Sequence, residues 1–207
     1  MANLKEIRNR ISSVSSTMQI TSAMKMVSAA KLKKAQDAIT AMRPYSDKLT
    51  QMLVDLSSSV DFENHFLQST DYKKLLVVCV TSNRGLCGAF NSNVIKECLE
   101  ISKTTDHEVS FYCIGKKGAD ILSKKHNVIE ISNEIFDDLN FQNVALIAEK
   151  LMSKFSEKEF DQIKIVYNKF KNAATQIVTN EQYLPIENNE SGEANESSDY
   201  IFEPSQT

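Results

Sequence analysis

The sequence has no run of eighteen apolar residues, so no segment of it is predicted to cross a membrane as a helix. The first twenty residues lack the apolar core of a secretory signal, and no other targeting segment is visible. A cytoplasmic location is therefore the default expectation. With 207 residues, of which 42% are hydrophobic and 25% charged, the chain is long enough to bury one core.

The usual signatures of metal and disulfide sites are also missing. The four cysteines are Cys79, Cys87, Cys98 and Cys113. They form no C-x-x-C pair, so they are predicted to be reduced thiols packed in apolar surroundings. The three histidines are His65, His107 and His126. They lie far apart in the chain, so no metal site is expected.

No catalytic motif is present, because the sequence has no G-x-S-x-G, no H-E-x-x-H and no carboxylate pair placed for acid–base chemistry. We predict no catalytic residue and no cofactor. The glycine-containing turn at 81–91 lies between a predicted strand and a helix, an order that favours anion binding. Gly85 and Gly88 nevertheless match neither the phosphate-loop nor the dinucleotide spacing. A small α/β enzyme that binds a nucleotide or phosphate here is kept as an alternative.

The chain from Leu4 to about Val60 is predicted to form one very long helix. Its first apolar residues alternate steps of three and four, the spacing of a coiled-coil seam: Leu4, Ile7, Ile11, Val14 and Met18. From Ile20 the stripe shifts, and it continues through Ala23, Met24, Val27 and Ala30. A helix of about 55 residues is roughly 80 Å long, whereas the rest of the chain would be about 40 Å across. The overhanging seam is therefore expected to pack against a partner helix.

Pro44 is the only proline of this stretch, and it is expected to kink or briefly interrupt the helix because it removes a backbone donor. Residues 1–44 carry eight basic and two acidic residues, a net charge of +6, whereas the rest of the chain carries −9. A basic helix can contact nucleic acid, an anionic membrane surface or an acidic protein, or it can be a solvated face.

Residues 74–186 are predicted to form a small α/β domain in which strands alternate with helices. The apolar run from Leu75 to Val80 has the composition of a buried central strand in a parallel sheet. Further strands are predicted at 108–114, 128–131, 162–167 and 175–184. Helices are predicted at 92–102 and 141–155, and a short helix is predicted to follow residues 115–118 and to end at Lys125. Residues 61–73 are interpreted as a linker, 187–199 as an acidic mobile loop, and 200–207 as the start of a returning segment.

Several segments together resemble the gamma subunits of F-type ATP synthases. L-K-E-I-R-N-R-I at 4–11 is similar to the opening helix of that family, and I-T-S-A-M-K-M-V-S-A-A-K at 20–31 to its most specific signature. R-P-Y at 43–45, R-G-L-C-G at 84–88 and Y-N-K-F at 167–170 resemble later family segments. The resemblance extends from Met1 to about Pro204.

The resemblance implies a long N-terminal coiled-coil helix attached to a small Rossmann-like α/β domain. In the family, this helix pairs antiparallel with a C-terminal helix inside a hexamer of alternating alpha and beta subunits. The α/β domain stays outside and touches the epsilon subunit and the c-subunit ring. A family member would continue past Pro204 with a long helix, so the present chain is expected to be truncated.

The implied function is that of a non-catalytic central-stalk rotor subunit, which couples rotation of the ion-driven ring to ATP synthesis. The implied location is peripheral, on the cytoplasmic face of the bacterial inner membrane, and the chain reaches the membrane only through the complex. No nucleic-acid partner is expected. A generic coiled-coil scaffold, which would self-associate through the Leu4 to Met18 seam, is a second alternative.

The candidate contact residues form three groups. The shaft contacts are Ile7, Ile11, Val14, Met18, Ile20, Met24, Met26, Val27, Lys31, Lys33 and Lys34. The turn of the α/β domain contributes Arg84, Gly85, Leu86, Cys87 and Gly88. Tyr200, Phe202 and Glu203 are the candidate contacts to the ring.

Overall fold

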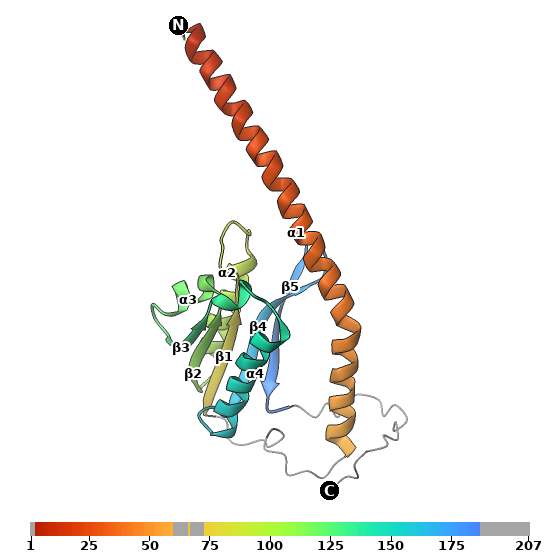
Figure 1. The fold of residues 1–207 in the computed structure, drawn as a ribbon. Helices are drawn as coiled ribbons and strands as arrows, with labels where there is room; N and C mark the ends of the chain where they lie inside the picture. Colours follow the sequence, from red (N-terminus) through yellow and green to blue (C-terminus); the bar gives the residue numbers. More distant parts are fainter. Residues whose placement is uncertain (1–2, 60–65, 67–72, 187–207) are drawn as a thin grey trace. The chain divides into compact units, whose positions relative to one another are not determined.

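The computed structural model describes residues 3–59, 66 and 73–186 of the chain. They fall into two compact units, one that contains the long N-terminal helix and one that contains the sheet. The fold class is α/β, as the sequence predicts (Figure 1). Most of the predicted linker, the acidic segment 187–199 and the candidate ring contacts at 200–203 lie outside the described residues.

Helix α1 (Leu4–Ser59) is a single helix of 56 residues. Asn3 precedes it, and the Asn3 side-chain oxygen accepts a hydrogen bond from the backbone N–H of Lys5 at 3.3 Å, which satisfies one of the unpaired donors of the first turn. The helix includes Pro44 without a break, so the chain is not interrupted there. A kink at Pro44, as distinct from an interruption, stays a prediction.

The second unit is built on a five-stranded sheet in the order β3-β2-β1-β4-β5 (Figure 1). The strands are β1 (Lys74–Val80), β2 (Glu108–Ile114), β3 (Asn127–Ser132), β4 (Gln162–Phe170) and β5 (Gln176–Leu184). Strand β1 pairs parallel with both β2 and β4, and its residues 75–79 are all buried. This confirms the buried central strand that the apolar run predicts.

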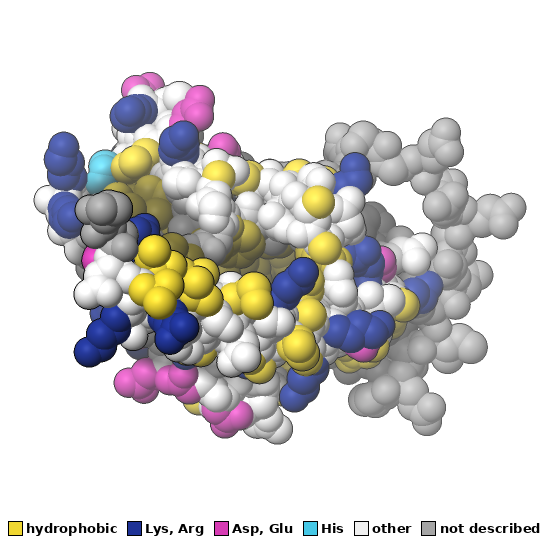
Figure 2. Space-filling view, turned by 90° about the horizontal axis from the view of Figure 1, so that it is seen from above, with side chains coloured by type: hydrophobic (Ala, Val, Ile, Leu, Met, Phe, Trp, Pro, Cys, Tyr) yellow, Lys and Arg dark blue, Asp and Glu magenta, His cyan; other side chains and the backbone are white. Residues whose placement is uncertain are grey.

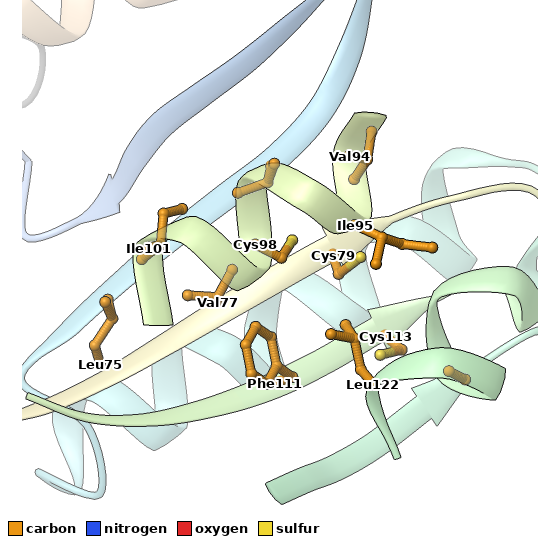
Figure 3. Close-up of a cluster of buried hydrophobic side chains, with 12 residues drawn as sticks. Leu75, Val77, Cys79, Val94, Ile95, Cys98, Ile101, Phe111, Cys113 and Leu122 are labelled. Carbon is orange, nitrogen blue, oxygen red and sulfur yellow. The ribbon is translucent and has the colours of Figure 1, made fainter. Parts of the chain in front are cut away.

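Helices cover both faces of this sheet because the side chains of β1 alternate between the two faces. Leu75, Val77 and Cys79 pack with α2 (Phe90–Thr104) and α3 (Lys116–Leu122), in the cluster drawn in Figure 3. Leu76 and Val78 pack on the other face with α4 (Phe141–Ser156). A short 3-10 helix, η1 (Glu134–Phe136), follows β3 and leads into α4. The unit therefore has three layers, with β1 at the centre.

Strand β5 differs from a purely parallel arrangement, because it pairs antiparallel with β4. Only residues 171–175 separate the two strands. A parallel crossover needs a dozen or more residues, so this short connection can form only a hairpin. The sheet is therefore mixed, with an antiparallel edge strand.

Three of the four cysteines are buried, as predicted, but Cys87 is exposed. The prediction of a packed thiol is wrong at Cys87 because this residue lies in the turn before α2 and not inside a strand or helix. Cys79 and Cys113 are paired neighbours in the β1–β2 register. Hydrogen bonding to Cys79 and burial raise the pKa of the Cys113 thiol, which keeps that thiol protonated and poorly reactive.

Candidate interaction surfaces

The apolar stripe of α1 faces solvent along its whole first half. Ile7 is 45% exposed, and the remaining candidate apolar contacts are between 56% and 69% exposed. These are Ile11, Val14, Met18, Ile20, Met24, Met26 and Val27. A soluble protein gains stability by burying side chains of this size, so this surface is suited to contact with other helices.

The stripe occupies two sides of α1. Each residue of an α-helix advances by about 100° around the axis, so the step from Met18 to Ile20 moves the stripe by about 200°. Ile7, Ile11 and Met18 therefore lie on one side of the helix, and Ile20 and Val27 lie nearly opposite. A helix with apolar stripes on two sides needs two neighbours to bury both.

Small polar residues next to Val14 and Met18 make the first stripe easy to bury. The hydroxyl of Thr17 donates to the carbonyl of Ser13 at 2.9 Å, and the hydroxyl of Thr21 donates to the carbonyl of Thr17 at 2.7 Å. Both donors are satisfied within the helix, so a neighbouring helix could cover them without leaving an unpaired group. Together these residues line a shallow groove on α1.

The candidate lysines Lys31, Lys33 and Lys34 are exposed on α1. Lys33 pairs with Asp37 one turn later at 2.8 Å, and both side chains are more than 60% exposed. Such an exposed pair contributes little to stability, under about 1 kcal/mol. These exposed lysines can still contribute a long-range positive field that acts on a charged partner, although Asp37 offsets part of the charge of Lys33.

The turn between β1 and α2 is held in shape by Asn91, which is buried at the start of α2. The Asn91 side-chain oxygen accepts from the backbone N–H of Ser82 at 2.9 Å. The Asn91 amide donates to the hydroxyl of Ser82 at 2.9 Å and to the sulfur of Cys87 at 3.1 Å. Leu86 adopts a left-handed φ of 61° and its side chain is fully exposed. The turn therefore presents an apolar side chain on an ordered support.

The candidate residues of this turn lie together, and all five, from Arg84 to Gly88, are exposed. Gly88 has a φ of +59°, a conformation that glycine adopts at little cost. Gly85 has no positive φ, and its nearest neighbour is the Cε of Lys117 at 3.8 Å from an added Cβ. The backbone of this turn therefore favours glycine at Gly88 and not at Gly85.

Asn83, which the sequence reasoning missed, joins the turn to the loop after β3. The Asn83 amide donates to the carbonyl of Asn133 at 2.7 Å, and the Asn83 side-chain oxygen accepts from the backbone N–H of Lys116 at 3.0 Å. Asparagine is a common turn residue, and its place three residues after the end of β1 was the only available signal. Hydrogen bonds of Asn83 thus join the loops that follow β1, β2 and β3 at the carboxyl ends of these strands.

In the described ranges, no three His, Cys, Asp or Glu side chains come together in a way that could hold a metal ion. Within the same residues, no helix is both long enough and apolar enough to cross a membrane.

The ionisation of Tyr167, on β4, should be sensitive to the pairing of β4 with β5, because its hydrogen-bond partner Glu181 lies on β5. Its hydroxyl donates to both carboxylate oxygens of Glu181 at 3.0 Å. Burial and this hydrogen bond raise the pKa of Tyr167 from 10.0 to about 12. The folded state holds the phenolic proton more tightly than the unfolded chain, so this contribution to stability is present below pH 10 and is lost between pH 10 and about 12.

Spectrophotometric titration of the unmodified chain should therefore include a tyrosine ionisation near pH 12 that is lost in Tyr167→Phe. Glu181→Gln should bring that ionisation part of the way back toward pH 10, because it removes the charge but leaves the burial. An unchanged titration in Tyr167→Phe would contradict the assignment.

Comparison with known proteins gives a consistent result. A family model described as ATP synthase matches residues 3–207. The ATP synthase gamma chain of Flavobacterium johnsoniae is 60% identical over 99% of this chain and 73% of its own length. The protein of the same name from Christiangramia forsetii is 55% identical with the same two coverages.

Solved structures agree with these matches. A chain in the cryo-EM structure of the Tetrahymena thermophila mitochondrial ATP synthase central stalk and c-ring is 30% identical, with a TM-score of 0.66. The match covers 80% of this chain and 72% of that one. A chain of the Euglena gracilis mitochondrial ATP synthase rotor is 24% identical with a TM-score of 0.60, a likeness of fold alone.

Proposed function

Because the chain belongs to the ATP synthase gamma chain family, we propose that it is the central-stalk rotor subunit of a proton-translocating ATP synthase. It couples rotation of the c-subunit ring to ATP synthesis in the catalytic hexamer, and it makes and breaks no covalent bond itself. Its partners are the alpha and beta subunits, the epsilon subunit and the ring. Its location is peripheral, on the cytoplasmic face of the bacterial inner membrane.

The observation that carries this proposal is α1, a continuous 56-residue helix with apolar stripes on two sides. A rotating shaft needs stiffness along its length, and paired helices supply it by burying one stripe between them. The second stripe remains available to contact the surrounding hexamer of alpha and beta subunits. The two sides of the shaft differ in side chains, so rotation would present different surfaces to each beta subunit in turn.

The α/β unit would serve as the foot of the rotor. Its exposed turn at Arg84 to Gly88 is held by Asn91 and Asn83, so a force applied at the turn reaches the central strand without deforming a loose loop. We propose this turn as a contact to a neighbouring subunit. We also keep Tyr200, Phe202 and Glu203 as candidate contacts to the ring.

Co-purification tests the proposal directly. The tagged full-length chain should bring down the alpha, beta and epsilon subunits in one complex with ATPase activity, and the chain alone should have none. A variant with aspartate in place of Ile11 and Val27 should lose the alpha and beta subunits, because each substitution puts a charge into one of the two stripes. Recovery of the chain without these subunits would contradict the proposal.

A triple substitution of Lys31, Lys33 and Lys34 by glutamine should weaken assembly with the hexamer about threefold to tenfold at low salt. The reason is that these lysines contribute to the positive field of α1, which attracts an acidic partner. The thermal unfolding of the isolated chain should change little, since all three side chains are exposed.

The matched control for this prediction replaces Lys103, Lys124 and Lys125, three exposed lysines of the α/β unit, by glutamine. Association with the hexamer is measured at low and at physiological salt. Equal affinities for the two triple variants at low salt would show that the lysines of α1 have no special part in assembly.

A further inference from the structure

The exposed methionines of the described residues are gathered on α1. Four side chains are more than half exposed, and all of them belong to this helix: Met18, Met24, Met26 and Met42. By contrast, Met152 on α4 is half-buried and packs on the core of the α/β unit. The view from above in Figure 2 shows hydrophobic side chains uncovered on the surface, with basic side chains close by. The thioethers of α1 are therefore open to reagents in solution.

Met18 and Met24 lie on the two different stripes of α1. At about 100° per residue, Met18 lies on the side of Ile7 and Ile11, and Met24 lies within about 60° of Ile20 and Val27. Met26 is turned by about 80° from Met18 and by about 160° from Met24, so it lies between the two stripes. A change of polarity at Met18 and Met24 would therefore alter both stripes, whereas the same change at Met26 would fall outside their lines.

A peroxide supplies such a change of polarity without an enzyme. The methionine sulfur attacks one oxygen of hydrogen peroxide, the O–O bond breaks and an S–O bond forms. The sulfur loses two electrons and the peroxide gains them, so the products are one sulfoxide and one water. The sulfoxide is polar, and thiol-dependent methionine sulfoxide reductases convert it back to the thioether.

The helix surface next to Met18 has its hydroxyl donors already in use. The hydroxyl of Thr17 donates to the carbonyl of Ser13 at 2.9 Å, and the hydroxyl of Thr21 donates to the carbonyl of Thr17 at 2.7 Å. Neither hydroxyl is free to donate to a sulfoxide oxygen at Met18. Covering the stripe would therefore remove water from that oxygen without supplying a donor from these threonines, which costs binding free energy.

We propose that Met18 and Met24 form an oxidation site that controls assembly of the chain. A peroxide converts both thioethers to sulfoxides while the stripes are uncovered, the oxidised chain binds the hexamer of alpha and beta subunits weakly, and reduction restores binding. The inference rests on the proposed function, because it takes the hexamer as the partner. It goes beyond that function by assigning a reversible modification to two residues.

The first measurement needs only the chain. Hydrogen peroxide is added, and peptide mass spectrometry gives the rate of sulfoxide formation at each methionine. We expect Met18 and Met24 to react about tenfold faster than Met152, because exposure controls the access of the reagent. In the complex with the hexamer, both should react about as slowly as Met152. Rates at Met18 and Met24 that match the rate at Met152 in the chain alone would overturn the inference.

The second measurement is the affinity for the purified hexamer after peroxide treatment and removal of the peroxide. All chains carry Met42→Leu, so that Met42 does not contribute, and this background chain is the reference. The test variant adds Met18→Leu and Met24→Leu, and its matched control adds Met26→Leu at a side chain that is 69% exposed. Leucine is close to methionine in volume and has no sulfur to oxidise.

We expect peroxide to weaken the binding of the background chain and of the Met26→Leu control about tenfold, and methionine sulfoxide reductases to restore it. The test variant should bind within about twofold of its untreated affinity. An equal loss in the test variant, or no loss in the background chain, would overturn the inference while the untreated chain still binds. Failure of the untreated chain to bind the hexamer would instead overturn the proposed function, and this inference with it.

Discussion

Replacement of Gly115 by alanine should destabilise the α/β unit by about 3–5 kcal/mol, or prevent it from folding. Gly115 follows β2 with a φ of +106°, a backbone conformation that residues with a side chain rarely adopt. An added Cβ would lie 2.0 Å from the carbonyl oxygen of Thr81 and 2.7 Å from its carbonyl carbon. These atoms belong to the backbone, so no side-chain rotation can relieve the clash.

The backbone around Gly115 also has little freedom to move. The backbone N–H of Thr81 donates to the carbonyl of Ile114 at 2.8 Å, and the N–H of Gly115 donates to the carbonyl of Ser132 at 3.2 Å. A shift large enough to admit a methyl group would break hydrogen bonds that link the ends of β1, β2 and β3.

Denaturant unfolding of the full-length chain measures this effect, with Gly85→Ala as the control. Gly85 has no positive φ, and the nearest atom to its added Cβ is the flexible Cε of Lys117 at 3.8 Å. We expect the free energy of unfolding of the control to change by less than about 1 kcal/mol. A Gly115→Ala variant as stable as the Gly85→Ala control would show that the loop after β2 can rearrange.

Phe111→Ala should cost about 3–5 kcal/mol of unfolding free energy. Phe111 is fully buried on β2, where its register neighbours are Val77 on β1 and Val128 on β3. The Phe111 ring meets the ring of His126 edge to face at 5.4 Å. Truncation would leave a cavity in the centre of the cluster shown in Figure 3, and the surrounding strands cannot close over it.

The matched control for Phe111→Ala is Phe141→Ala, since Phe141 is 82% exposed. We expect its free energy of unfolding to differ from that of the unmodified chain by less than about 1 kcal/mol. The comparison uses the midpoint and slope of denaturant unfolding for each variant. Similar losses in the two variants would mean that the core described around Phe111 is not the one that stabilises the unit.

Most of the fold could be predicted because its strongest elements have local causes. The run from Leu75 to Cys79 is buried throughout because a continuous apolar strand is stable only between two covered faces. The seam spacing from Leu4 to Met18 has the period of a helix, and the structure has α1 there. The direction of β5 could also have been predicted, since residues 171–175 are too few for a parallel crossover.

The residues that shape the candidate surfaces were less accessible to prediction. Asn83 and Asn133 lie 50 residues apart, and nothing in either local sequence indicates that they share a hydrogen bond. Cys87 was predicted to be packed from its apolar neighbours, but its exposure depends on the turn geometry that Asn91 imposes. The exposure of Phe141 was missed because the period of α4 fits a core-facing helix, and only the three-dimensional arrangement shows that Phe141 lies beyond the part that packs on the sheet.

The central place of β1 has a consequence for how the chain is made. Its parallel partner β4 is reached only 87 residues later, as the pairing of Leu75 with Gln162 shows. At ribosomal rates of about 5–20 residues per second, β1 would wait roughly 4 to 17 seconds for that partner to be synthesised. For most of this time its apolar run has neither β4 beside it nor α4 above it, since α4 is made shortly before β4. Helix α1, by contrast, needs only local contacts and can form within about a microsecond. The nascent α/β unit should therefore depend on chaperones most strongly between the synthesis of β1 and that of β4.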